Sequence, residues 1–279
     1  MKIVKIIIVI IVLCTSIVFY SKYVGTSGLE TREYRVESNV LTSNFSGIKV
    51  IHFSDLLYGS TTDLKDLTNM VEKMNILEPD LILFTGDLIS NKHKLTEDDK
   101  KKIIENLSKL EASIGKYAIY GDFDFDLNSY ESIITSSGFK LLTNEYEEVF
   151  YKTNESMFIE GLPSSIKNKN DKTKSFEFYS DENRKYTIVM LHEGKTIKYI
   201  DESTYEVDLI LGGHSLNGKI RLPFIGGLFK DEASYKYYDE SYERGITKIY
   251  ISGGMGTLDY DFRLNNKPSF NLYRLKAQS

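Results

Sequence analysis

The stretch PDLILFTGD, residues 79–87, shows the two features that decide the fold of this 279-residue chain. Its apolar run, residues 81–84, is short and continuous, as in strands that are buried on both faces of a sheet. A glycine and an aspartate follow directly, so the end of the strand presents the carboxylate of Asp87. The segment GIKVIHFSD, residues 47–55, repeats this pattern and ends in Asp55.

A helix is expected between these two strands. Apolar residues recur there on one helical face: Leu64, Leu67, Val71, Met74 and Leu77. The polar residues 60–63 suit its start and Pro79 suits its end. A second helix is expected after Thr96 and Asp99, which have the spacing of a capping box. The alternation of strands and helices along the chain favours an α/β fold.

Further apolar runs predict five more strands: KYAIYGD (116–122), KYTIVMLHE (185–193), VDLILGGH (207–214), KIYISGG (248–254) and FNLYRL (270–275). The polar stretch 164–174 has no periodicity and predicts an exposed loop. The part of the chain after residue 215 therefore has the pattern of a β-rich closing half.

Polar side chains that can bind a metal stand at the ends of these strands. They are Asp55, Asp87, Asp122 with Asp124, His192 and His214. Because neighbouring parallel strands bring their carboxyl ends to one edge of a sheet, we expect these side chains to meet in one crevice. Two imidazoles and several carboxylates suit one divalent ion such as Mn²⁺, Zn²⁺ or Fe²⁺.

Residues 1–28 predict a membrane anchor. Lys2 and Lys5 come before an apolar stretch from Ile6 to Tyr20. Counted from Ile3 the span is about 18 residues, near the lower limit for crossing a bilayer. The run is apolar on all sides, unlike an amphipathic core helix, and no convincing cleavage site follows it. The flanking lysines favour an N-terminus on the inside. We therefore expect a single-pass protein of the cell membrane, with residues 29–279 as one extracytoplasmic domain.

The composition excludes several classes of protein. With 41% hydrophobic and 27% charged residues, the chain can bury a substantial core and is not disordered throughout. Its net charge is −5 and it has no basic stripe, so we expect no nucleic-acid partner. The single cysteine, Cys14, lies in the apolar run and excludes both a disulfide framework and a cysteine-based zinc site. Any metal must bind to histidines and carboxylates.

With these motifs in order, the chain resembles the calcineurin-like metallophosphoesterases, and in particular their membrane-anchored bacterial branch. The resemblance covers roughly residues 30–276 and rests on five segments: SDLLYG, TGDL, YGDFD, MLHEG and GGHSLNGKIRLPFIGG. It implies a sandwich of two mixed β-sheets flanked by helices. It also implies a site where two metal ions hydrolyse phosphate mono- or diesters.

The resemblance assigns one chemically complete metal site. Its ligands would be Asp87, Asp122, His192 and His214, where Asp122 stands in place of the asparagine of the family. A carboxylate binds a cation more tightly than an amide does. The four residues together can hold one divalent ion.

The other positions depart from the family pattern. The second ion would use Asp55 and Asp87 with two histidines, but Leu57 and Leu216 occupy the histidine positions and offer no lone pair. The histidine that acts as general acid in the family is replaced by Phe123. The active site is therefore reduced, and a binuclear centre of the usual kind cannot form.

The other polar residues near these motifs have structural interpretations. His52 lies within a strand and is expected to be a packed or hydrogen-bonded core residue, whereas His93 lies in a polar loop and is expected to be exposed. Asp55 is either a weak metal ligand or a cap for the following turn. Asp124 has no catalytic histidine to orient and is expected to bind backbone groups.

Two functions follow from this pattern. The first is a hydrolase of phosphate mono- or diesters with a single-metal site, whose substrate is a small phosphoester or a lipid or other component of the cell envelope. The second is a catalytically inactive member of the family: an anchored extracytoplasmic domain that binds a ligand or a protein in the same cleft.

Overall fold

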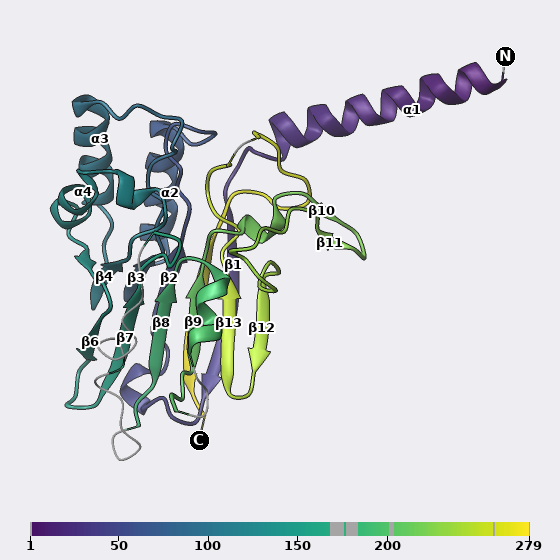
Figure 1. Ribbon diagram of the computed structural model, residues 1–279. Coiled ribbons are helices and arrows are strands. Elements are labelled where there is room, and N and C mark those ends of the chain that lie inside the picture. Colours follow the sequence, from purple (N-terminus) through teal and green to yellow (C-terminus); the bar gives the residue numbers. More distant parts are fainter. Residues whose placement is uncertain (1, 168–175, 177–183, 201–203, 259, 279) are drawn as a thin grey trace.

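The computed structural model describes residues 2–167, 176, 184–200, 204–258 and 260–278 (Figure 1). Helix α1 (Lys2–Phe19) continues into a π-helical turn, η1 (Tyr20–Val24), and projects away from an α/β body. None of the residues of α1 is buried. The loop predicted over residues 164–174 falls largely outside the described residues.

The first sheet of the body has six strands among the described residues. Their order is β1 (Glu30–Ser38), β14 (Ser269–Ala277), β2 (Lys49–Phe53), β3 (Leu81–Phe84), β4 (Gly115–Ala118) and β5 (Lys140–Leu141). Strands β2 to β5 are parallel, β14 is antiparallel to β2, and β1 is parallel to β14. The carboxyl ends of β2, β3 and β4 therefore lie at one edge.

The second sheet is also six-stranded within the described part of the chain. Its order is β12 (Ser241–Arg244), β13 (Thr247–Ile251), β9 (Leu209–Gly212), β8 (Thr187–Leu191), β7 (Ser156–Leu162) and β6 (Glu145–Phe150). The four central strands are parallel, and β12 and β6 are antiparallel edges. A short antiparallel hairpin, β10 (Arg221–Leu222) and β11 (Gly226–Gly227), protrudes from the body.

Three α-helices accompany the first sheet: α2 (Leu64–Ile76), α3 (Glu97–Leu107) and α4 (Tyr130–Ser136). Four short 3₁₀ helices complete the described elements: η2 (Ser43–Phe45), η3 (Asp124–Asp126), η5 (Gly194–Tyr199) and η6 (Leu216–Gly218). Asp63 caps α2, and Thr96 with Asp99 forms the predicted capping box of α3. The predicted sandwich of two mixed sheets with helices is confirmed.

Side chains alternate between two cores along each inner strand. In β3, Ile82 and Phe84 join the core beneath the helices, whereas Leu81 and Leu83 face the second sheet. A third core covers the outer face of the second sheet, where residues of η5 pack on β8, β9 and β13. The continuous apolar runs of the sequence thus reflect strands buried on both faces.

His52 lies in the core as expected. It is fully buried, and its Nε2 atom lies 2.9 Å from the hydroxyl oxygen of Thr85. Its Nδ1 atom lies 3.4 Å from the hydroxyl oxygen of Tyr273. Burial lowers the pKa of His52 from 6.5 to about 3. The imidazole is therefore neutral in the folded protein at neutral pH.

This burial makes the stability of the fold sensitive to acid. The pKa of His52 is lower in the folded than in the unfolded chain, so its contribution is complete above pH 6.5 and is lost as the pH falls towards 3. As the pH is lowered from 6 to 4, the free energy of unfolding should fall less steeply in His52→Gln than in the unmodified protein. The difference in slope should be up to about 1.4 kcal/mol per pH unit. Urea unfolding at each pH measures this slope.

Tyr273→Phe is the matched control, because it alters a neighbour of the imidazole but keeps the titrating group. Its pH profile should keep the slope of the unmodified protein. Parallel profiles for His52→Gln and the unmodified protein would contradict the prediction.

Candidate metal centre

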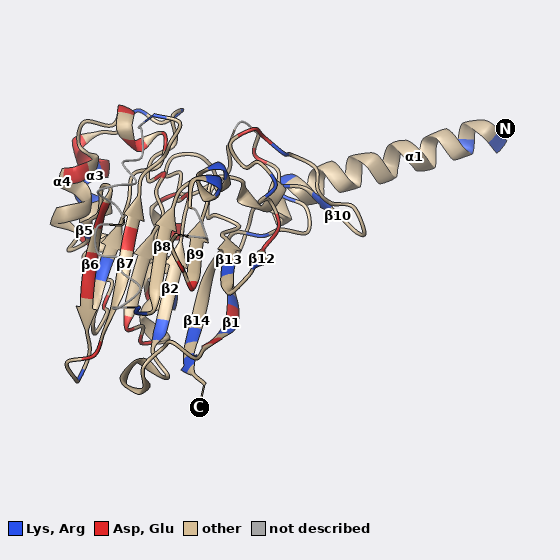
Figure 2. Ribbon diagram, turned by 60° about the horizontal axis from the view of Figure 1, so that its bottom comes forward, with Lys and Arg blue, Asp and Glu red and all other residues tan. Residues whose placement is uncertain are grey.

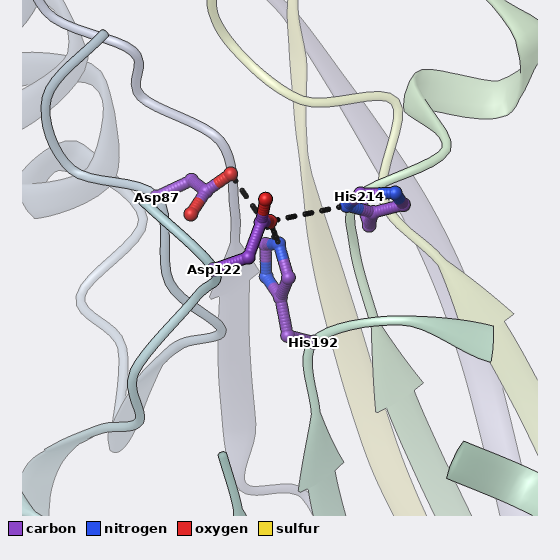
Figure 3. A group of neighbouring side chains, drawn as sticks. All are labelled: Asp87, Asp122, His192 and His214. Carbon is purple, nitrogen blue, oxygen red and sulfur yellow. Dashed lines mark hydrogen bonds and ion pairs between the residues drawn. The ribbon is translucent and has the colours of Figure 1, made fainter. Parts of the chain in front are cut away.

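Four polar residues meet where the carboxyl ends of the two sheets come together (Figure 3). Asp87 follows β3 and Asp122 follows β4, while His192 follows β8 and His214 follows β9. Their ligating atoms all lie within 4.8 Å of one another. The first sheet thus supplies the carboxylates and the second sheet the imidazoles. These are four of the six strand-end residues that the sequence singled out, and they are the four to which the resemblance assigned one complete metal site.

His192 is fully buried and held in one orientation. Its Nδ1 atom donates a hydrogen bond of 2.7 Å to the carbonyl oxygen of Thr85. Since a carbonyl can only accept, the lone pair of a neutral ring is on Nε2. That atom lies 3.0 Å from Oδ1 of Asp122 and 3.3 Å from Oδ2 of Asp87. Such a backbone partner is typical of a histidine that binds metal.

His214 has a carboxylate on each side of its ring. Its Nδ1 atom lies 3.3 Å from Oδ1 of Asp122, and its Nε2 atom lies 3.5 Å from Oδ2 of Asp231. Asp231 is half-exposed, and its other oxygen accepts a hydrogen bond of 2.5 Å from the backbone N–H of Ser234. Asp231 thus supports the outer side of the imidazole. It was missed in the sequence because it belongs to no motif.

Tight turns place these side chains. Asp87 and His214 both have left-handed backbone conformations, with φ of 62° and 63°. A non-glycine residue in this conformation costs about 1 kcal/mol or more, and such strain gathers at functional sites. Gly121 lets the next loop approach, because a Cβ atom there would lie 2.1 Å from Oδ1 of Asp87.

Asp124 holds the two carboxylate-bearing loops together. It is buried, and its two oxygens accept backbone hydrogen bonds from Asp87 (2.7 Å), Leu88 (2.9 Å) and Gly121 (2.8 Å). The backbone N–H of Phe123 donates in turn to Oδ1 of Asp87 at 3.0 Å. The expected binding of Asp124 to backbone groups is therefore observed.

Burial and ion pairing shift the pKa values in this cluster. Burial raises the pKa of Asp87 to about 6, against the opposing effect of His192. Burial opposes ionisation of Asp122, but the neighbouring imidazoles of His192 and His214 outweigh it and lower its pKa. Burial likewise opposes protonation of the two histidines, yet their carboxylate neighbours raise the pKa of both, that of His214 to about 10. Protons thus compete with any cation for these nitrogens.

The residues fit a divalent cation. At 3.3 Å, the contacts of Asp87 Oδ2 and His214 Nδ1 lack hydrogen-bond geometry, so both are buried polar atoms without a hydrogen-bond partner in the described part of the chain. Such atoms are costly unless they bind something. Two nitrogens and two carboxylates are a ligand set for Zn²⁺, Mn²⁺ or Fe²⁺.

Asp55, the fifth candidate, lies apart from this group of ligands. Its Oδ2 atom accepts a hydrogen bond of 3.0 Å from the backbone N–H of His214, so it orders the loop that carries the histidine. Its Oδ1 atom has no hydrogen-bond partner among the described residues. Asp55 therefore lies outside the group of four and orders the backbone of the loop that carries His214.

Two leucines and an arginine lie beside Asp55. Leu57 and Leu216 are fully buried and press against the loop after β13: a Cβ atom on Gly254 would lie 2.2 Å from Leu216 and 3.5 Å from Nη2 of Arg263. The guanidinium of Arg263 is buried and donates to backbone carbonyls. Burial lowers its pKa to about 9, and the charge of Asp55 opposes this effect.

His93 differs from its expectation. Its side chain is half-buried rather than exposed, and Nε2 lies 3.2 Å from Oδ2 of Asp99. Its ring also packs edge-on against Tyr58. Asp99, which belongs to the capping box of α3, therefore binds a histidine that the sequence predicts to be exposed.

Comparison of the sequence with models of known protein families identifies the family to which the chain belongs. The model of the calcineurin-like phosphoesterases matches residues 48–218, which include every motif of the cluster. The chain belongs to this family. A relative from Bacillus subtilis, the uncharacterized metallophosphoesterase YkuE, is 30% identical over 261 residues, which are 92% of this chain and 89% of the relative.

More distant members of the family are also similar. The UDP-2,3-diacylglucosamine pyrophosphatase LpxG of Chlamydia muridarum is 20% identical, over 77% of this chain and 79% of that protein. A transmembrane protein with metallophosphoesterase domain from Danio rerio is 20% identical over 85% of this chain. The chain spans 55%, about half, of the length of that relative.

The N-terminal segment of this family member is suited to a membrane. The helix over Lys2–Val24 has 23 residues, and its apolar 18-residue window has a mean hydropathy of 2.8 and no buried residue. By length and composition it can cross a bilayer. This agrees with the membrane anchor expected from the sequence.

The cluster predicts a measurable effect of metal. A cation that binds only the folded state at a hundredfold excess over its Kd stabilises it by about 2.7 kcal/mol. At 2–4 °C per kcal/mol, the melting temperature should rise by roughly 5–10 °C. His214→Ala should abolish the rise. Asp231→Asn should weaken binding roughly tenfold or more, because it alters the outer support of the imidazole. Thermal unfolding with increasing Mn²⁺ or Zn²⁺ checks both variants.

Glu232→Gln is the matched control for Asp231, because Glu232 lies on the surface and pairs with Lys195. It should bind metal like the unmodified protein. A melting temperature that does not respond to Mn²⁺, Zn²⁺ or Fe²⁺ would show that the cluster binds none of them.

Proposed function

We propose that this chain is a membrane-anchored phosphoesterase that works with one divalent ion, held by Asp87, Asp122, His192 and His214. The proposal is carried by one observation: buried ligand atoms of Asp87 and His214, which have no hydrogen-bond partner among the described residues, lie within 4.8 Å of the ligand atoms of Asp122 and His192. A cation bound there would polarise a phosphoryl oxygen and lower the pKa of a bound water.

The protein supplies orientation and charge to this chemistry. Thr85 and Asp231 fix the two imidazoles, so that one nitrogen of each ring faces the carboxylates. Asp124 keeps the loops of Asp87 and Asp122 in contact. Groups held in this way need little rearrangement when charge develops on the substrate.

The resemblance puts the general acid of the family at position 123, where this chain has Phe123. Phe123 lines a cavity of about 290 Å³ together with residues of the loop after β3, including Ser90 and His93, and with Asp126. We assign the leaving group of the substrate to this cavity. Without an acid at position 123, the reaction favours leaving groups that depart without a proton, such as aryl oxides or phosphates.

The substrate class follows from this preference and from the anchor. LpxG is by name a pyrophosphatase of UDP-2,3-diacylglucosamine, a sugar nucleotide that carries two acyl groups. We propose a phosphoester or pyrophosphate of the cell envelope, with the lipid-linked form favoured by attachment of the enzyme to the membrane. The body lies on the outer side, because Lys2 and Lys5 hold the other end of α1 inside.

Leu57 and Leu216 favour a second function, that of a catalytically inactive binding domain. Both are fully buried where the family would place the histidines of its other ion. A site of this kind could also serve an inactive domain that binds a phosphorylated ligand or a protein. Turnover of an aryl phosphodiester with Mn²⁺, lost in Asp87→Ala, supports the hydrolase. Metal binding without any turnover supports the inactive domain.

The identity of residue 123 predicts the dependence on leaving group. Phe123→His places a proton donor beside the cavity, so kcat/KM for an alkyl phosphodiester should rise by about 10²–10⁴-fold, the usual contribution of general acid catalysis. An aryl phosphodiester, whose leaving group needs no proton, should gain much less. Steady-state kinetics on the two substrates at equal metal loading measure the difference.

Phe123→Leu serves as control, since it removes the ring without adding a donor. It should leave the ratio of aryl to alkyl turnover unchanged. Equal gains on both substrates in Phe123→His would argue against a missing acid as the cause.

Sidedness has a direct test in cells that express the full chain. Protease added to intact cells with a permeable outer layer should degrade the body and leave the anchor. Degradation only after lysis would place the body on the inside and would refute the proposed topology.

A further inference from the structure

The hairpin β10–β11 has an apolar tip. Phe224 is fully exposed, Ile225 is 64% exposed, and Leu228 and Phe229 are 48% and 49% exposed. All four follow one another within residues 224–229. Exposed apolar side chains in such a group mark a contact with a partner or a membrane.

The backbone at the tip holds an aromatic residue where glycine would be comfortable. The N–H of Ile225 donates to the carbonyl of Leu222 at 3.2 Å, which closes a turn with Pro223 and Phe224 at its centre. Phe224 has a φ of 66°. Glycine or asparagine is usual at such a position, and a bulky residue costs about 1 kcal/mol or more. The geometry of the turn therefore does not explain why a phenylalanine is found at position 224.

Hydrogen bonds tie the hairpin to the end of the anchor helix. The backbone N–H of Arg263 donates to the carbonyl of Ser21 at 2.9 Å. The neighbouring Leu264 exchanges backbone hydrogen bonds with Lys219 (3.3 Å) and Arg221 (2.9 Å) at the base of the hairpin. Packing is close, because a Cβ atom on Gly25 would lie 1.8 Å from the carbonyl oxygen of Arg263.

This connection sets the direction of the hairpin. In both ribbon views the hairpin leaves the body on the side from which α1 projects, with α1 rising and the hairpin descending from that side (Figures 1 and 2). The base of the helix carries Tyr20 and Tyr23, which are 41% and 58% exposed, beside Lys22. Aromatic and basic residues of this kind mark the boundary of a bilayer.

We propose that the tip of the hairpin, Phe224 and Ile225, inserts into the membrane leaflet next to the C-terminal end of α1. Leu228 and Phe229 follow β11 at the base of the hairpin, where the N–H of Leu228 donates to the carbonyl of Ile220 at 2.9 Å. The inference rests on the proposed anchoring by α1, but not on catalysis. The bilayer is the occupant that fits, because α1 already brings it to the level of the tip. His214 and Asp231 flank the hairpin in the chain, so insertion holds the metal centre close to the membrane surface.

The chain contains no tryptophan, which allows a single reporter at each place. Three full-length variants are reconstituted in phosphatidylcholine vesicles with or without brominated acyl chains: Phe224→Trp at the tip, Val12→Trp within the anchor, and Phe150→Trp at the exposed edge strand β6. Phe224→Trp should emit at shorter wavelength than Phe150→Trp and should lose intensity in brominated vesicles. Phe150→Trp should be unaffected by bromine.

Val12→Trp distinguishes failure of the hairpin insertion from failure of the proposed anchoring by α1. Quenching of Val12→Trp without quenching of Phe224→Trp would overturn the insertion of the hairpin and leave the anchor intact. No quenching of Val12→Trp would refute the anchoring itself. Emission of Phe224→Trp that is shifted in detergent but insensitive to bromine would mean that protein covers the tip, which also overturns the proposal.

A second pair of variants guards against misfolding. Ile225→Trp reports the same depth from the neighbouring position, with or without Phe224→Gly. Glycine suits the left-handed turn, so the double variant should fold at least as well. Its tryptophan should be quenched less than that of Ile225→Trp alone. Equal quenching would show that the phenyl group does not insert.

Discussion

The carboxyl group of Asp124 is the constraint on which the metal centre depends. Its oxygens gather backbone N–H groups from the turn after β3 and the turn after β4. These turns belong to separate strand connections, and without a common acceptor their buried N–H groups would lack partners. Burial and the nearby charge of Asp87 raise the pKa of Asp124 to about 7, while the backbone hydrogen bonds oppose this effect. One side chain outside the group of four therefore sets the distance between the two carboxylates of the candidate metal centre.

Much of this arrangement was predictable from the sequence, because strands that are buried on both faces appear as continuous runs of apolar residues. The run over residues 81–84 and the aspartate after it indicated both a central strand and a polar side chain at its end. The capping residues of α2 and α3 were readable for a similar reason, since a cap depends on local spacing. Local and periodic signals of this kind survive in a single sequence.

Contacts between segments that are distant in the sequence were not indicated by any pattern in it. The support of His214 by Asp231 depends on how the chain returns after the β10–β11 hairpin, and no spacing rule describes that path. His93 was expected in solvent, but Asp99 and Tyr58 hold it half-buried. Asp55 kept its place at a strand end, yet its carboxylate binds a backbone N–H, because leucines and not histidines surround it. Which partner a polar group finds is decided by tertiary packing.

The pairing of β1 with β14 has a consequence for how the protein is made. The strand that directly follows the anchor lies in parallel register with the last described strand, with Glu30 opposite Ser269 and Ser38 opposite Ala277. During synthesis β1 is made long before its partner β14. Strand β1 therefore stays with this edge unpaired until β14 has also been made. Closure of the first sheet is a late, long-range step, and a chain shortened at its C-terminus would leave that edge open to aggregation.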